Sequence, residues 1–130
     1  LGFSQSKRIK TINNQRVRIA KKYNEQIKKI KNISIPEIKP NRNHIFHLYT
    51  IKVEKNYHLT RDQLFLKLHK LGIGTSVQYY PLHLMSYYKK NLTLNLSNFP
   101  VSNDLSDKIL SLPIYPEMTE KQIEYIVDKL

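Results

Sequence analysis

The 130-residue sequence has no cysteine, only three glycines and no long uninterrupted hydrophobic run. Without cysteine, disulfide frameworks and cysteine-ligated zinc sites are excluded, and a reducing cytoplasm is the simplest setting. No apolar stretch approaches the roughly 20 residues that a membrane helix needs, and no signal peptide is recognisable. We therefore expect a cytoplasmic protein that has no membrane partner.

Repeats and low-complexity segments are also absent. Hydrophobic residues make up 40% of the chain, which favours a folded state, and the length suits one domain rather than two. The first residue is Leu1 rather than methionine, so we expect a fragment or a processed chain.

Acidic residues are scarce mainly in one segment. Residues 1–31 contain ten Lys/Arg and only Glu25, a net charge of +9 within a total of +12. Such a segment is typical either of a nucleic-acid surface, where lysines neutralise phosphates, or of the solvated face of a helix. We favour the helix face and do not expect nucleic acid to be the partner.

The basic segment also has helical periodicity. Over residues 5–31, apolar residues recur at steps of three and four, which predicts a long amphipathic helix with its lysines on the other face. These apolar residues are Ile9, Ile12, Ile19, Ala20, Tyr23, Ile27 and Ile30. Pro36 and Pro40 then mark a connection, and the long helix could lie outside the core of the domain.

The middle of the chain predicts a strand, a helix and a second strand. "HIFHLYTIKV" (44–53) is rich in aromatic and β-branched residues and predicts a strand buried on both faces. Residues 59–72 predict a helix capped by Thr60 and ended by Gly72. Residues 73–80 predict a strand that stops at Pro81.

The last third predicts mostly helix. Residues 82–90 suit one or two helical turns, and residues 98–111 predict a helix capped by Ser102, with Leu105, Ile109 and Leu110 facing inward. "LPIYP" (112–116) predicts a short edge strand between prolines. Thr119 and Gln122 form a capping box that opens a final helix, whose core side is Ile123, Ile126, Val127 and Leu130. The fold class is α+β: one sheet of about three strands with helices on one face.

No catalytic or metal motif stands out in the sequence. The five histidines lack metal-ligand spacing, and no glycine-rich phosphate loop follows a strand. The polar candidates are Gln78, Tyr79 and His83, which end a strand, enter a loop and can donate hydrogen bonds, accept them or stack. The alternative is a buried histidine bonded to backbone, with tyrosines that only pack the sheet.

Five short stretches, in order along the chain, resemble the DegT/DnrJ/StrS family of pyridoxal-phosphate (PLP) sugar aminotransferases. The first two are Arg16, Ala20 and Tyr23, like "R…A..Y", and His47 to Ile51, like "H-L-Y-x-I". The third contains Arg61, Asp62, Leu64, Leu68, Gly72, Ile73 and Thr75, and the fourth runs from Val77 to His83 with Tyr87 and Tyr88 behind it. The fifth contains Phe99, Pro100 and Val101, then Ser111 to Pro116, Thr119 and Ile123.

The resemblance implies the small C-terminal domain of a fold-type I PLP enzyme. Residues 1–32 would be the long interdomain helix and residues 33–130 the small domain, with the large PLP-binding domain upstream. The parent enzyme would transfer an amino group from an amino acid, glutamate in our expectation, to a keto-sugar nucleotide for polysaccharide or glycan biosynthesis. It would be a homodimer whose partners are the nucleotide-sugar and the amino-acid donor.

In the family, the stretch matching Val77–His83 lies beside the active-site cleft, so Gln78, Tyr79 and His83 become substrate-binding candidates. Gln78 replaces a family histidine and keeps only neutral hydrogen bonding. The Schiff-base lysine of the family lies upstream, so we expect no catalytic residue, no covalently bound PLP and no activity from this chain alone. The alternatives are a basic nucleic-acid-binding module and a non-catalytic domain that complements a separately encoded large domain.

Overall fold

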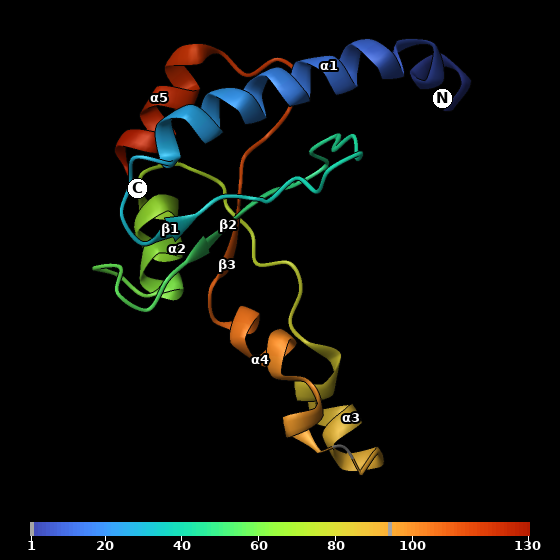
Figure 1. The fold of residues 1–130 in the computed structure, drawn as a ribbon, viewed down its shortest axis with the longest axis vertical. Coiled ribbons are helices and arrows are strands. Elements are labelled where there is room, and N and C mark those ends of the chain that lie inside the picture. The colour runs from blue at the N-terminus through green and yellow to red at the C-terminus, as the bar shows by residue number, and fades with distance from the viewer. Residues whose placement is uncertain (1, 94) are drawn as a thin grey trace.

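The computed structural model describes residues 2–93 and 95–130 and shows a small α+β body from which an arm extends (Figure 1). The helices of the body are α1 (Gly2–Ile27), α2 (Arg61–Lys70) and α5 (Glu120–Asp128), and its strands are β1 (Ile33–Ser34), β2 (Tyr49–Val53) and β3 (Ile109–Leu112). The arm, residues 79–106, contains the short helices η1 (Leu82–Leu84), α3 (Ser86–Asn91), η2 (Leu96–Asn98) and α4 (Pro100–Ser106).

The sheet is antiparallel, in the order β1-β2-β3. Tyr49 pairs with Leu112 and Ile51 pairs with Leu110, so these apolar side chains share one face. Along β2, Tyr49, Ile51 and Val53 are buried, whereas the two residues between them are only half-buried. The predicted α+β class with helices on one face is confirmed, but the predicted burial of this strand on both faces is wrong.

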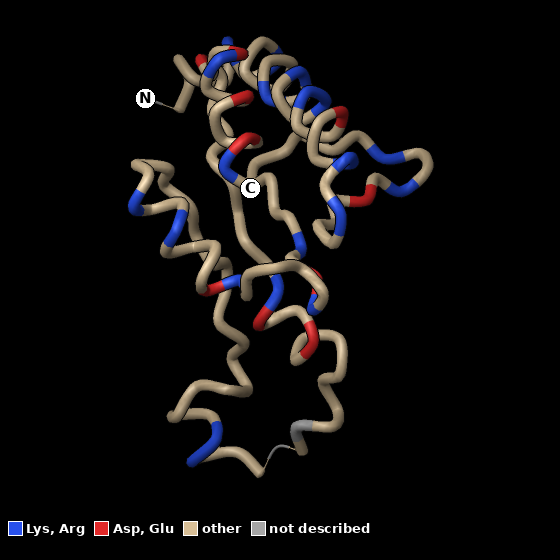
Figure 2. The backbone as a smooth tube through the Cα atoms, turned by 90° about the vertical axis from the view of Figure 1, so that its left-hand side faces the viewer, with Lys and Arg blue, Asp and Glu red and all other residues tan. Residues whose placement is uncertain are grey.

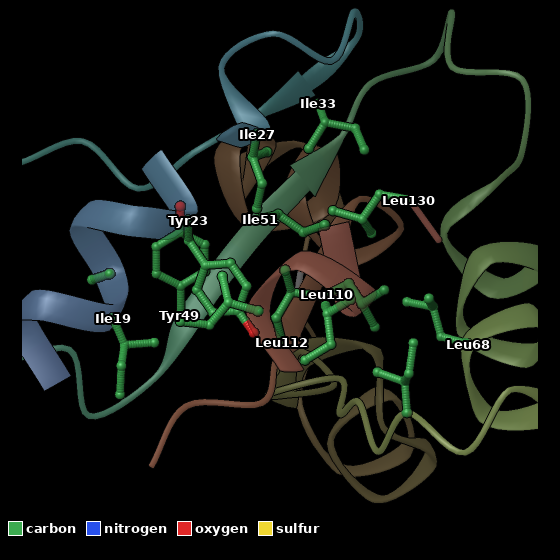
Figure 3. Close-up of a cluster of buried hydrophobic side chains, with 14 of the residues drawn as sticks. Ile19, Tyr23, Ile27, Ile33, Tyr49, Ile51, Leu68, Leu110, Leu112 and Leu130 are labelled. Atoms are coloured by element: carbon green, nitrogen blue, oxygen red, sulfur yellow. The ribbon is translucent and has the colours of Figure 1, made fainter. Parts of the chain in front are cut away.

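Three helices cover the buried face of the sheet (Figure 3). The side chain of Tyr23 from α1 lies beside Tyr49, with ring centroids 4.7 Å apart, while Leu68 reaches the core from α2. From α5, Ile123 and Ile126 are buried, and Leu130 follows them at the chain end, as predicted. Apolar burial of this kind is the main force that stabilises a domain of this size.

The two halves of α1 have different surroundings. Ile19, Ala20, Tyr23 and Ile27 are fully buried, so the second half of the helix belongs to the core. The first half projects beyond the sheet, and Ile9 on the same stripe is 56% exposed (Figure 1). The lysines and arginines of α1 line much of its length (Figure 2), and Lys7, Lys10 and Lys21 are exposed, which agrees with a solvated helix face.

The two helices with strong capping signals begin where the sequence places them. Thr60 accepts a hydrogen bond from the Gln63 backbone N–H, and Gln63 bonds back to the Thr60 N–H. The same reciprocal pair forms between Thr119 and Gln122 at the start of α5. Gly72 follows α2 with a φ of 76°, a left-handed conformation that glycine adopts without steric cost.

Two predicted strands are shorter than expected. Residues 44–48 are irregular, because Phe46 has a positive φ of 50° that a strand does not allow, so β2 begins only at Tyr49. Within residues 73–80, only Ser76 bridges to the sheet, through Ser111. The two-residue strand β1 was not predicted, because so short a run has no periodicity.

The predicted helix over 98–111 and the predicted strand over 112–116 are also wrong in their bounds. Helix α4 starts at Pro100, the favoured first position for proline, so Ser102 lies inside it and does not cap it. Ile109 and Leu110 belong to β3, which ends at Leu112. As predicted for this stretch, β3 is an edge strand of the sheet, and a single bridge from Ser76 to Ser111 touches its outer side.

Candidate functional site

The three candidate residues lie where the body meets the arm, but each has a different environment. Gln78 is half-buried, Tyr79 is 77% exposed, and His83, in η1, is only 7% exposed. The structure therefore does not present them as one set of converging polar groups. Their substrate-binding role stays a prediction.

His83 joins η1 to α4 within the arm. Its Nε2 lies 2.7 Å from Oδ1 of Asn103 in α4, and its ring stacks on Phe99 with centroids 4.4 Å apart and planes 19° apart. This matches the alternative of a buried, satisfied histidine, except that the partner is a side chain rather than backbone. A ring held this way positions the loop but has one nitrogen already engaged.

Gln78 and Tyr79 differ from His83 in having polar groups that are not used within the arm. The Gln78 Oε1 atom is buried and finds no hydrogen-bond donor among the described residues. A buried acceptor without a donor costs free energy, so this atom is one of the few unsatisfied polar groups of the described residues. Tyr79 offers its whole ring and hydroxyl to solvent.

The arm also exposes an unusual amount of apolar surface. The exposed fractions are 77% for Tyr79, 56% for Tyr80, 61% for Leu82, 69% for Tyr87 and 70% for Val101. Exposed aromatic side chains are enriched at interfaces and ligand-binding surfaces. The arm is therefore better suited to contact another molecule than to stand alone in water.

The other residues that carried the resemblance mainly stabilise the fold. Arg16 Nη1 donates to three backbone carbonyls, of Phe46, His47 and Ile114, at 3.0–3.3 Å. The Tyr23 hydroxyl donates to the Pro113 carbonyl at 2.9 Å. These contacts join α1 to the segments that flank β2 and β3.

Sequence reasoning missed the partners on which this site depends. Asn103 and Phe99, which hold His83, come from a segment predicted as one long helix. Only the "Phe-Pro" pair at residues 99–100 gave a signal there. Asn24, which accepts a 2.7 Å hydrogen bond from the Tyr49 hydroxyl, carried no signal at all.

Few polar side chains are buried among the described residues, which limits where a charged cofactor group could be held. Their buried polar side chains are Thr75, His83 and Ser111; no lysine, aspartate or glutamate is buried in residues 2–93 or 95–130. The same residues contain no group of three potential metal ligands.

None of the helices in the described part of the chain is long and apolar enough to cross a membrane.

Known proteins share both the sequence pattern and this fold. The spore coat polysaccharide biosynthesis protein SpsC of Bacillus subtilis is 31% identical over 130 residues, covering 98% of this chain and 33% of that protein. A DegT DnrJ EryC1 StrS aminotransferase from Brucella abortus superposes with a TM-score of 0.82 and 30% identity, over 98% of this chain and 32% of its own. A sugar aminotransferase structure from Streptococcus pneumoniae in its PLP form has a TM-score of 0.84 at 24% identity, with 98% and 32% covered.

The body and arm thus have the fold of one part of PLP aminotransferases. The chain belongs to the DegT/DnrJ/EryC1/StrS aminotransferase family, whose sequence model matches residues 1–130. It spans about a third of the length of the relatives it matches.

Proposed function

We propose that this chain is the small C-terminal part of a PLP-dependent sugar aminotransferase. The parent enzyme moves an amino group from an amino acid, glutamate in the simplest case, to a keto-sugar nucleotide that feeds polysaccharide or glycan biosynthesis. The observation that carries this proposal is the family match over residues 1–130, together with the similarity of the fold to sugar aminotransferases. Homodimerisation of the parent enzyme and its cytoplasmic location belong to the same proposal.

The described residues do not fit a complete PLP site. When bound, PLP supplies the electron sink for amino-group exchange, and its attachment needs a sheltered lysine and an acid beside the pyridine nitrogen. Lysines and acids of this chain are not buried in the described part. We therefore place the attachment lysine outside these residues and expect no transamination from the 130-residue chain alone.

The contribution of this chain is to position substrate. The exposed ring of Tyr79 supplies a stacking surface and a hydroxyl, and the half-buried Gln78 supplies neutral hydrogen bonding to the nucleotide-sugar. His83 joins the two sides of the arm through its contacts with Asn103 and Phe99. Positioning of this kind contributes to catalysis without proton transfer.

The test uses a polypeptide extended upstream to the length of the relatives. Purified with PLP, it should change its absorbance when glutamate is added, while the 130-residue chain should not. In that longer enzyme, Tyr79→Ala should raise KM for the sugar nucleotide roughly tenfold, as one lost stacking contact would, while Tyr79→Phe, which keeps the ring and loses only the hydroxyl, should raise it less. Absence of any absorbance change with every amino donor would contradict the proposed reaction.

A docking role for the same chain is supported by the exposed aromatic face of the arm. In this version the large PLP-binding domain is encoded separately and the chain complements it. Co-purification of the 130-residue chain with a PLP-containing partner would support this version, and a single continuous reading frame for both parts would exclude it. The nucleic-acid alternative for the basic segment stays a prediction that a salt titration of binding would test.

A further inference from the structure

A cavity whose lining contains none of the three candidate residues lies between the loop that follows α2 and the outer side of α5. Its volume is about 430 Å³. Its apolar base contains Ile73 and Met118, which are 4% and 1% exposed, and the partly exposed rings of Tyr115 and Tyr125 line it as well. This volume lies within the range of cavities that bind small organic ligands, and aromatic linings favour planar rings.

The lining of this cavity is positively charged. Lys121 is the only charged residue in its lining. Two of the three acids of α5 face elsewhere: Glu120 and Glu124 line a hollow on the side of α1, where Glu120 Oε1 lies 3.5 Å from Nζ of Lys22. An anionic group on a bound ligand would therefore meet an ammonium group and no carboxylate in the lining.

The positive character extends along the same helix. Nζ of Lys129 lies 5.4 Å from the centroid of the Tyr125 ring, although Asp128, at 2.8 Å from Lys129, offsets part of its charge. The Tyr125 hydroxyl donates to the Leu71 carbonyl at 3.2 Å, which fixes the ring at the edge of the cavity. This hydrogen bond keeps the Tyr125 ring in one orientation along the side of the cavity.

Two glycines keep one side of the cavity open. A Cβ atom at Gly72 or Gly74 would meet no heavy atom within 4 Å. Gly72 needs its positive φ, so glycine is explained there by backbone conformation. Gly74 has no such constraint, and its missing side chain leaves free volume that a leucine would fill.

We propose that this cavity binds a small aromatic carboxylate. The ring packs against the partly exposed rings of Tyr115 and Tyr125, above the buried Ile73 and Met118, and the carboxylate pairs with Nζ of Lys121. Burial of the ring supplies the favourable free energy, and Lys121 selects an anion over a neutral or cationic analogue. None of the candidate substrate-binding residues Gln78, Tyr79 and His83 lines this site.

The experiment is an NMR titration of the 15N-labelled chain with indole-3-carboxylate, with indole and tryptamine as neutral and cationic probes. Saturable shifts should be centred on residues 72–74, 115, 121 and 125, with the order carboxylate, then indole, then tryptamine. Lys121→Gln should weaken carboxylate binding about two- to fivefold, the range for an exposed ion pair, and leave indole unchanged. Lys70→Gln, an exposed position outside the lining, is the matched control.

Gly74→Leu should abolish the shifts by filling the cavity. If circular dichroism shows that this variant is unfolded, Tyr115→Ala, which removes one wall, should weaken all three probes. Several results would overturn the proposal: no saturable shift, shifts centred on the arm, or binding that survives both cavity variants. Binding that is lost in the upstream-extended polypeptide would also overturn it, because the cavity would then be a contact between domains.

Discussion

At the scale of single residues, Arg16 is the point where three separated segments meet. One guanidinium nitrogen donates to carbonyls of residues that lie 30, 31 and 98 positions away in sequence. The lysine side chain is one bond shorter than the path to Nη1, so its ammonium does not reach the same position. In the sequence, only the family resemblance marked Arg16, because its partners are backbone atoms that leave no pattern.

We predict that Arg16→Lys lowers the free energy of unfolding by about 1–3 kcal/mol, since it leaves partly buried carbonyls without donors while keeping the charge. Urea unfolding followed by circular dichroism measures this. Arg42→Lys, at an exposed position, is the control and should change stability by less than about 0.5 kcal/mol. Equal effects of the two variants would show that the three hydrogen bonds contribute nothing specific.

At the scale of elements, the arm has little core of its own. In α3 and α4 no described residue is buried, whereas His83 in η1 is buried between Phe99 and Asn103. One histidine therefore holds α4 against the loop that leaves the body. Segments with few buried apolar contacts open at lower free energy than the core does.

We predict that His83→Ala loosens the arm without unfolding the body. Amide hydrogen exchange should become faster in described residues of 82–106 and stay unchanged in β2 and β3. His58→Ala, which removes an exposed histidine next to Tyr57, should leave the exchange of the arm unchanged. Uniformly faster exchange across the whole chain would mean that His83 stabilises the entire domain instead.

At the scale of the whole molecule, two neutral tyrosines in the core link stability to pH. Burial raises the pKa of Tyr23 well above its usual value, with smaller contributions from Tyr49 and Tyr115, and burial likewise raises the pKa of Tyr49. In the unfolded chain, both hydroxyls ionise near pH 10. Above that pH, the unfolded state loses protons that the folded state retains, so stability falls as pH rises.

We predict a constant contribution of these tyrosines below pH 9 and a loss that begins near pH 10, of up to about 1.4 kcal/mol per pH unit for each tyrosine. Urea unfolding between pH 7 and pH 11.5 measures the slope. Tyr49→Phe should be less stable at neutral pH, because it loses the hydrogen bond to Asn24, but should show a shallower alkaline slope. An unchanged slope in this variant would contradict the assignment.

The parts of the fold that the sequence predicted correctly depend on neighbours in the chain. The apolar stripe of α1 and the two capping boxes are local, because residues three or four apart meet on one helix face or within one turn. These local signals determined α1, α2 and α5 and the inward side of α5, and the ordered short stretches determined the family.

Only the tertiary structure decided the rest, because it depends on pairing between distant residues. Ile109 and Leu110 follow Leu105 at helical spacing. They nevertheless form a strand, because the backbone of β2 from Tyr49 to Lys52 pairs with them. His83 holds the loop at η1 against α4, because Asn103, twenty residues away, accepts its hydrogen bond. The cavity beside Lys121 formed because α5 folds back over the glycines that follow α2, a contact that spans nearly fifty residues.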